Sequence, residues 1–297
     1  GNANAASGNC GSVVVGGMSN ISSGLSSFVG GGCGNDATDA GSAVVGGHSN
    51  CAACKGTFVG GGSCNSAQGD FATIAGGVCN SSCGKFGSIG GGCNHDSQDC
   101  FGTVGGGLCN CVSNYGTVGG GEQNSACGCC HSTVGGGMLN ISCGSETTVA
   151  GGRSNCAVGG KSTIGGGCCN YAGCFGTVGG GLHNRVCASA TSSTIAGGDQ
   201  NKADCGACAF IGGGYSLSAH NNFDTIVGGC KNDTYSANGT GNFIGGGQNN
   251  KVACGKQTVI VGGSKNTTSG GAYNGVIVGG YSNVVATSAF VGGGACN

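Results

Sequence analysis

The chain lacks proline and tryptophan and carries few charges, and each shortage excludes a class of protein. Among 297 residues, 10 are Lys or Arg and 11 are Asp or Glu, giving a formal net charge of -1. Such a balance provides no electrostatic attraction to nucleic acid or to an anionic membrane. A collagen triple helix needs abundant Pro with Gly at every third position, and disordered chains are rich in charge and Pro. Neither class fits, and no apolar run is long enough to cross a bilayer.

Glycine and cysteine are the residues in excess. Gly occupies 74 positions and Cys occupies 25. So many cysteines are typical of a cross-linked protein in an oxidising compartment, and the odd count means that they cannot all pair within this chain. We therefore expect an extracellular location or the surface of a cell or virion.

One short pattern recurs through the whole sequence. It reads Ser-Thr-Ile-Gly-Gly-Gly-Cys-Cys-Asn at residues 162–170, with a Gly-Gly pair always four and three residues before the closing residue. The closing residue is Asn in all but two copies, where it is His95 or Leu217. A fixed period of about 15 residues predicts a repeat architecture. The closing residues are 20, 35, 50, 65, 80, 95, 110, 124, 140, 155, 170, 184, 201, 217, 232, 250, 266, 283 and 297.

The repeat predicts strands and not helices. A helix interior loses about 1 kcal/mol for each Gly, and no apolar residue recurs with the helical period. Each copy instead has one β-branched residue six positions before its close, next to Gly residues that permit a sharp corner. We therefore predict an all-β fold: a parallel β-solenoid (β-roll) of about 19 coils, elongated as a rod. Residues 1–297 would form a single repetitive solenoid, a fragment of a longer repeat protein. Its interior ladder would consist of Val14, Val29, Val44, Val59, Ile74, Ile89, Val104, Val118, Val134, Val149, Ile164, Val178, Ile195, Ile211, Ile226, Ile244, Ile260, Ile277 and Val291.

A second short strand is expected after each closing residue. Its second residue is usually small, as in Ala37, Ala52 and Ala67, and should face the interior ladder. The closing Asn residues should form a ladder of their own at a corner, because Asn tolerates turn conformations and bonds to nearby backbone. The steps that end at Asn201, Asn250 and Asn283 are longer, and the extra residues should bulge outward.

The outward side of the first strand suggests self-association. The residue seven positions before each closing residue is Thr in nine copies and Phe in five, and it is Val, Ala or Ser in the others. A stripe of Thr, Phe and Val beside bare Gly is a surface on which another chain could pack closely. Such residues can also be tolerated singly on a surface, which is the plainer interpretation.

These units resemble the head repeats of trimeric autotransporter adhesins. The resemblance rests on the Ser/Thr-x-Val/Ile-x-Gly and Asn-x-Ala-x-Gly runs, and it covers nearly the whole chain. It implies a left-handed parallel β-roll, three chains side by side and a role in surface attachment. The Gly-Gly pair and the many cysteines depart from that family. The Asn-x-Val-x-Gly runs are also similar to the β-rolls of grass ice-binding proteins.

Motifs for catalysis or cofactors are absent or match by chance. The run Cys127-Gly128-Cys129-Cys130-His131 has the haem-attachment spacing, but with 25 cysteines about two such Cys pairs arise at random. The five His residues keep no fixed spacing to the cysteines, and acidic residues are too sparse for calcium-binding turns. No nucleophilic triad or phosphate loop recurs. We expect no catalytic residue, no metal, no cofactor and no enzymatic activity.

Two kinds of covalent modification can be predicted. Cys at matching positions in adjacent coils lie close enough for a disulfide. We expect at least two of four pairs to bond. Cys64 with Cys79 and Cys127 with Cys143 match in phase, while Cys174 with Cys187 and Cys93 with Cys109 are one step off. Six Asn residues lie in glycosylation sequons, namely Asn20, Asn80, Asn140, Asn232, Asn238 and Asn266. Asn238 is the expected acceptor because it alone lies in an insertion.

The functional hypothesis is a structural segment of an extracellular filament or surface fibre. It would be non-enzymatic, self-associating through lateral or end-to-end contacts, possibly as a trimer, and stabilised by disulfides. The alternative is a surface adhesin that binds a receptor or polysaccharide. Ice binding through the outward Thr residues is a third hypothesis. No nucleic-acid partner and no membrane insertion are expected for this segment.

Overall fold

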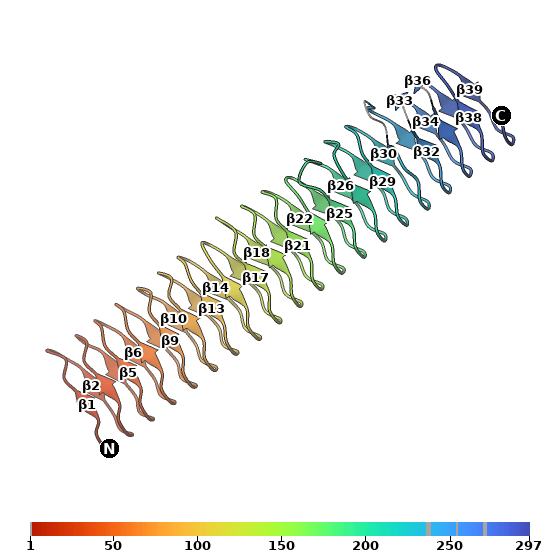
Figure 1. Cartoon of the computed structure of the whole chain (residues 1–297). Helices are drawn as coiled ribbons and strands as arrows, with labels where there is room; N and C mark the ends of the chain where they lie inside the picture. The colour runs from red at the N-terminus through yellow and green to blue at the C-terminus, as the bar shows by residue number, and fades with distance from the viewer. Residues whose placement is uncertain (1, 236–238, 254, 270–271) are drawn as a thin grey trace. The chain divides into compact units, whose positions relative to one another are not determined.

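The chain folds as an all-β solenoid of parallel stacked strands, with about 19 turns about 15 residues apart. This computed structural model describes residues 2–235, 239–253, 255–269 and 272–297. Two compact units divide the chain, residues 1–146 and 147–297. In each unit two strands of two residues alternate with two corners, and most coils repeat this order (Figure 1). The predicted fold class is confirmed.

The first unit contains two parallel sheets, one formed by the strand after each closing residue and one by the strand before each Gly-Gly pair. The first sheet consists of β1 (Ala5–Ala6), β3 (Ile21–Ser22), β5 (Asp36–Ala37), β7 (Cys51–Ala52), β9 (Ser66–Ala67), β11 (Ser81–Ser82), β13 (Asp96–Ser97), β15 (Cys111–Val112), β17 (Ser125–Ala126) and β19 (Ile141–Ser142). The second consists of β2 (Val13–Val14), β4 (Phe28–Val29), β6 (Ala43–Val44), β8 (Phe58–Val59), β10 (Thr73–Ile74), β12 (Ser88–Ile89), β14 (Thr103–Val104), β16 (Thr117–Val118) and β18 (Thr133–Val134).

The second unit repeats this arrangement. After each closing residue come β21 (Cys156–Ala157), β23 (Tyr171–Ala172), β25 (Arg185–Val186), β27 (Lys202–Ala203), β29 (Ser218–Ala219), β32 (Lys251–Val252), β35 (Thr267–Thr268) and β38 (Val284–Val285). Before each Gly-Gly pair come β20 (Thr148–Val149), β22 (Thr163–Ile164), β24 (Thr177–Val178), β26 (Thr194–Ile195), β28 (Phe210–Ile211), β30 (Thr225–Ile226), β31 (Phe243–Ile244), β34 (Val259–Ile260), β37 (Val276–Ile277) and β39 (Phe290–Val291). The pair β33 (Gly255–Lys256) and β36 (Ala272–Tyr273) forms an additional small sheet in the insertions.

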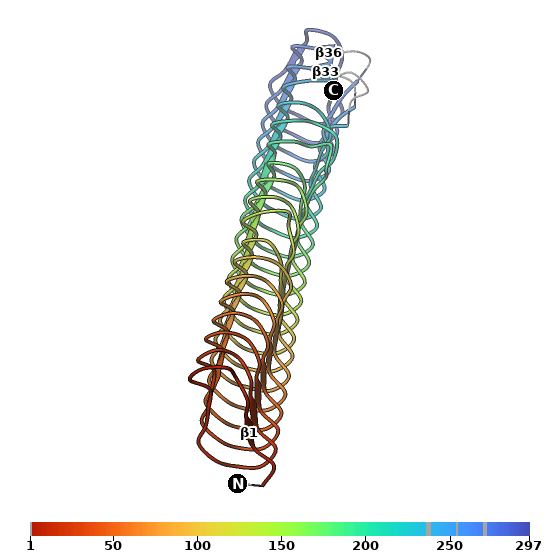
Figure 2. The ribbon, with the colours of Figure 1, turned by 90° about the vertical axis from the view of Figure 1, so that its left-hand side faces the viewer.

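Backbone hydrogen bonds join each coil to the next. The Phe58 N–H donates to the Ala72 carbonyl oxygen at 3.0 Å, and the Gly60 N–H donates to the Ile74 oxygen at 2.9 Å. The register is therefore fixed residue by residue, with Val59 opposite Ile74 and Ile74 opposite Ile89. Figure 2 shows the resulting coils from the side within each unit. Equivalent positions of successive coils form columns at the inter-strand spacing of about 4.8 Å.

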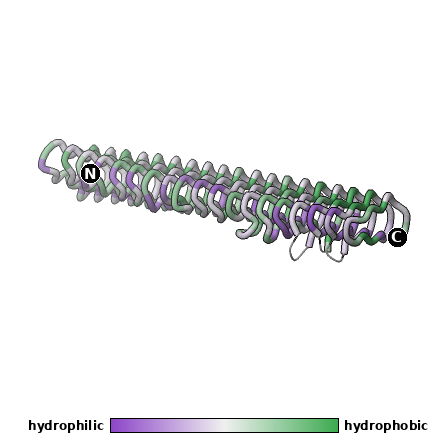
Figure 3. The backbone as a smooth tube through the Cα atoms, turned by 90° about the horizontal axis from the view of Figure 1, so that it is seen from above, coloured by the Kyte–Doolittle hydropathy of each residue, from purple (hydrophilic) through white to green (hydrophobic). Residues whose placement is uncertain are grey.

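Three columns of side chains fill the interior of the coils. Of the 19 predicted ladder residues, 17 are buried, while Val14 and Val291 in the outermost coils are half-buried. The small residues of the facing strand, such as Ala37, Ala52 and Ala67, are fully buried opposite them. The third column holds Ser or Thr in some coils and Ala, Gly, Asp224 or Asn242 in others. In one of these coils Thr57 Oγ1 donates to the Cys54 carbonyl oxygen at 2.7 Å. Figure 3 shows polar and apolar segments recurring along the coils of each unit.

Glycine is required at the corner for steric reasons. Gly62 has φ +90, and a Cβ placed on it would lie 2.0 Å from the carbonyl oxygen of Gly77 in the next coil. Residues immediately before the closing Asn also adopt the left-handed region, for example Cys64 with φ +58. A non-Gly residue pays about 1–2 kcal/mol there. The cost recurs in every coil because the corner must reverse the chain within a few residues.

Candidate functional site

The closing Asn residues form a buried side-chain ladder. Asn50 Nδ2 donates to the carbonyl oxygen of Gly46 in its own coil (3.0 Å) and to that of Gly62 in the next coil (2.9 Å). Its Oδ1 accepts the backbone N–H of Asn65 at 3.1 Å. The same three contacts recur along each unit and satisfy corner groups that have no strand partner. The ladder is therefore a structural device of the corner.

The ladder includes one residue that sequence reasoning missed and two substitutions. Asn4 belongs to it, because its Oδ1 accepts the Asn20 N–H at 3.0 Å and its Nδ2 donates to the Gly17 oxygen. The signal that could have found it is the Asn-x-Ala run of residues 4–6, at a spacing to Asn20 of 16 residues that other coils share. His95 keeps the contact through Nδ1, which accepts the Asn110 N–H at 3.0 Å. Leu217 is fully buried but offers no oxygen to the following coil.

Burial separates the glycosylation sequons. Asn20, Asn80, Asn140, Asn232 and Asn266 all occupy the ladder and are buried. An amide held inside a corner by backbone carbonyls is out of reach of a glycosyltransferase. The predicted acceptor Asn238 lies outside the described residues. Its glycosylation therefore stays a prediction.

All eight candidate disulfide cysteines are present as thiols, and the structure contains no disulfide among the residues it describes. The register divides the four pairs. Cys64 and Cys79 occupy the same corner position in adjacent coils, with φ of +58 and +56. Burial, and next the neighbouring Cys64, raise the pKa of the Cys79 thiol. Cys127 and Cys143 also match, because Ala126 stands opposite Ser142 one residue earlier.

The other two pairs are out of register. Cys93 stands opposite Leu108, so Cys109 is one position away. Cys187 follows Val186, which pairs with Ala172, so its neighbour in the adjacent coil is Gly173 and not Cys174. Cys174 stands four residues after the closing Asn170, whereas Cys187 stands three residues after Asn184, so the two are one position out of phase. The structure thus brings two of the four proposed pairs together.

In each unit, the outward side of the strands before the Gly-Gly pairs is a face without charge. We define the uncharged face as the side chains seven and five positions before each closing residue. The first column is Val13, Phe28, Ala43, Phe58, Thr73, Ser88, Thr103, Thr117, Thr133, Thr148, Thr163, Thr177, Thr194, Phe210, Thr225, Phe243, Val259, Val276 and Phe290. The second contains only Gly, Ala and Val. Neither column contains a charged residue or a cysteine, and none of their members is buried.

Phe residues on the uncharged face lie flat against glycine. A Cβ built on Gly30 would lie 3.3 Å from Cε1 of Phe28, and one on Gly60 would lie 3.4 Å from Cε1 of Phe58. The remaining three Phe of the column have the same relation to a Gly two residues later, at 3.3 to 3.5 Å (Gly212, Gly245 and Gly292). Where the second column has Ala or Val, the first column never has Phe. The rings therefore fold down onto bare backbone and keep the face level.

A separate aromatic column lies at the corner between the two strands of a coil. Phe71, Phe86, Phe101, Tyr115 and His131 stack ring on ring, with centroids 4.8 to 5.4 Å apart. Each adopts φ between +53 and +60, and Lys85 Nζ lies 5.2 Å from the Phe86 ring centroid. Offset stacking of this kind stabilises by about 0.5–1.5 kcal/mol per pair. Because neighbouring rings cover each other's faces, the column is poorly suited to stack a sugar ring.

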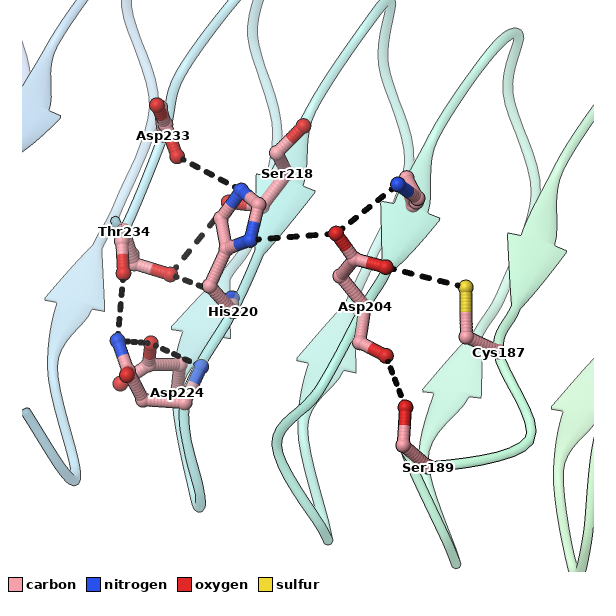
Figure 4. Close-up of polar contacts among 10 residues, drawn as sticks. Cys187, Ser189, Asp204, Ser218, His220, Asp224, Asp233 and Thr234 are labelled. Atoms are coloured by element: carbon pink, nitrogen blue, oxygen red, sulfur yellow. Dashed lines mark hydrogen bonds and ion pairs between the residues drawn. The ribbon is translucent and has the colours of Figure 1, made fainter. Parts of the chain in front are cut away.

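Charged groups gather in the second unit on the face formed by the strand after each closing residue. His220 lies between two carboxylates from adjacent coils: Nδ1 is 3.5 Å from Asp204 Oδ2 and Nε2 is 3.3 Å from Asp233 Oδ1 (Figure 4). Asp204 also accepts from Lys202 Nζ at 2.9 Å and from the Cys187 thiol at 3.2 Å. One imidazole therefore ties three successive coils together.

The pKa shifts in this cluster follow from its contacts. The Asp233 carboxylate raises the pKa of His220 above its ordinary value, against the opposing effect of burial. Burial acts to raise the pKa of Asp204, but bonds from Lys202 and Cys187 outweigh it and lower that pKa. Burial, together with the bond to Asp204, raises the pKa of Cys187. A thiol that donates to a carboxylate and holds its proton is a poor nucleophile.

Neither a metal centre nor a membrane-spanning helix can be built from the described residues. No group of three or more His, Cys, Asp or Glu side chains is placed to hold a metal ion in that part of the chain. No described helix is long and apolar enough to cross a membrane. The haem-spaced run places His131 in the aromatic column, stacked on Tyr115 at 5.0 Å.

Comparison with known proteins does not assign the chain to a family. No protein-family model matches the chain, and no curated protein matches it significantly.

Proposed function

We propose that this chain is a structural segment of an extracellular filament or surface fibre. The observation that carries the proposal is the uniformity of the coils: the Asn35, Asn50 and Asn65 side chains make equivalent contacts in successive coils. A binding or catalytic protein usually concentrates distinctive groups at one concave place. A scaffold whose coils are bonded alike transmits load evenly, which suits a shaft.

Cohesion in such a fibre would come from other copies of the chain and from disulfides. The core contains about one Val or Ile per coil, which is thin for a protein of this size. Lateral or end-to-end association would add burial, and the in-register pair Cys64 and Cys79 would add a covalent link between coils. The resemblance to trimeric autotransporter head repeats supports side-by-side packing of β-rolls, with three chains as one possible number. The activity would be non-enzymatic.

Sedimentation velocity and negative-stain microscopy over a range of concentrations test the proposal. A fibre segment should form assemblies that grow with concentration, side by side or end to end. A discrete trimer that stops growing would favour the adhesin alternative, which glycan and receptor binding assays would then examine. A chain that stays monomeric at every concentration would contradict the fibre.

Ice binding is a second candidate, favoured by runs of hydroxyls in register. Thr103, Thr117 and Thr133 stand opposite one another in successive strands of the first unit. Thr148, Thr163, Thr177 and Thr194 do so in the second unit. A regular hydroxyl array beside level Gly could order water on one face. Thermal hysteresis measured with and without Thr117→Lys decides it, because an ice-binding face would lose activity in the variant.

A further inference from the structure

We infer that the uncharged face is the surface through which two copies of this chain associate. The inference rests on the proposed function and names the part of the coil that would carry it. At the average composition of the chain, about six of the 38 positions on this face would be charged or Cys. None is. The face is thus kept free of the groups that are costly to desolvate against a neighbour.

The sheet formed by the strands after each closing residue carries charges, in contrast to the uncharged face. Position one after the closing residue holds Asp36 and Asp96 in the first unit and Arg185, Lys202, Asp233 and Lys251 in the second. Packing that sheet against a partner would bury charges that now face water, at several kcal/mol per unpaired group. The cost of burying charge therefore favours association through the uncharged face and not through the sheet after each closing residue.

The flatness of the uncharged face also favours it as the surface of association. Phe28 and Phe58 project from the strand but fold onto Gly30 and Gly60, so their rings offer apolar area without forming ridges. Phe28 remains 37% exposed and Phe58 40% exposed. Rings that cover bare backbone and keep one side open are typical of surfaces that exclude water on contact.

Periodicity identifies the occupant as a second copy. The face repeats once per coil, at the inter-strand spacing of about 4.8 Å, and its Thr hydroxyls recur at that interval. Another copy presents the same interval, so contacts made by one coil are repeated by the next. A folded partner with a different surface period would match only a few coils. The contact is expected to be isologous, with the same columns on both sides.

The area sets the strength of the contact. The nine first-column positions of the first unit, Val13 to Thr133, span roughly 40 Å by 10 Å, or about 400 Å² on each copy. A standard interface buries about 800 Å² on each partner. One unit alone would therefore associate weakly, and affinity should rise with the number of coils engaged.

Matched lysine substitutions test the inference. Thr117→Lys with Thr177→Lys places a charge on the uncharged face of each unit. Ser125→Lys with Thr267→Lys places the same charges on the outward positions of β17 and β35. We expect the first double variant to raise the dissociation constant about tenfold or more, and the second to change it little. Circular dichroism and urea midpoints establish that all variants are folded.

Salt provides an independent readout. Association through uncharged side chains should be nearly insensitive to ionic strength, whereas association through the charged sheet should weaken as salt rises. If the native chain associates but only Ser125→Lys with Thr267→Lys disrupts it, this inference is overturned and the proposed fibre stands. If the native chain does not associate at any salt concentration, the proposed function fails as well.

Discussion

The Asn35 side chain accepts the backbone N–H of Asn50, one coil on, through Oδ1 at 3.0 Å. This contact joins two residues 15 apart in sequence and recurs along each unit. It links the register of the coils to one side chain per repeat. It also explains why Gly-Gly and Asn recur together, since the Asn amide bonds to carbonyls that only a Gly corner brings within reach.

Replacing one ladder residue should therefore be costly. Asn50→Ala leaves the Gly46 and Gly62 oxygens without their amide donor and the Asn65 N–H without its acceptor. We expect a loss of about 2–4 kcal/mol in the free energy of unfolding, measured by urea denaturation. Asn114→Ala, at an exposed turn position, is the control and should change it by less than about 0.5 kcal/mol. Equal effects of the two variants would show that the ladder does not stabilise the corner.

His95 should make stability fall in acid. Burial lowers the pKa of His95, and its Nδ1 accepts a backbone N–H, so the folded chain favours the neutral ring. The unfolded chain binds the proton first, at a pKa of about 6.5. The contribution of His95 is thus complete above that pH and is lost progressively as the pH falls below it.

The His95→Asn variant isolates this effect. Asn restores the usual ladder residue and does not titrate in this range. The difference in urea midpoint between native chain and variant should shift in favour of the variant between about pH 7.5 and pH 5. A difference that stays constant across this interval would contradict the assignment.

His220 should act in the opposite direction. Its pKa is raised chiefly by Asp233, with Asp204 adding to the effect, so the folded chain favours the charged ring. Its stabilising contribution is complete below the unfolded pKa of about 6.5 and is lost as the pH rises through the folded value. His220→Asn should therefore cost more stability at about pH 6 than at about pH 8.5. Asp233→Asn should reduce this pH dependence, and a pH-independent cost of His220→Asn would refute it.

The aromatic column should stabilise the first unit. Phe101 stacks on Phe86 at 5.0 Å and on Tyr115 at 4.8 Å. Phe101→Ala loses both contacts, and we expect a loss of about 1–3 kcal/mol by urea denaturation. Phe175→Ala is the control, because Phe175 has the same left-handed backbone, with φ +53, and its ring contact within the described part of the chain is with Lys161 Nζ, 6.0 Å from the centroid, and not with another aromatic ring. A similar loss in both variants would attribute the effect to the backbone.

Disulfide formation should follow the register. Cys64 with Cys79 and Cys127 with Cys143 stand opposite each other in adjacent coils, which is the geometry a disulfide requires. Non-reducing peptide mapping of protein oxidised in air should recover these two links before Cys93 with Cys109 or Cys174 with Cys187. Recovery of only the two out-of-register links would contradict the corner alignment. Free thiols at all eight positions in the native material would indicate a reducing compartment.

Sequence alone determined the coil and its interior. The Val or Ile six positions before each close keeps its phase through spacers of 14 to 18 residues, and only a common buried environment demands such constancy. The Gly-Gly-x-x-Asn corner could also be predicted, because few other residues tolerate that backbone. These are local requirements, and their repetition in each coil makes them visible in the sequence.

Tertiary structure alone decided which residues stand side by side in adjacent coils. For Cys174 and Cys187, which are one step off in sequence phase, the strand register places Gly173 and not Cys174 beside Cys187. Asn4 joins the ladder through its side chain, whose Oδ1 accepts the Asn20 backbone N–H. The Phe71 to His131 column and the contacts of His220 with Asp204 and Asp233 arise between coils, where stacking and charge act across about 5 Å of space and not along the chain.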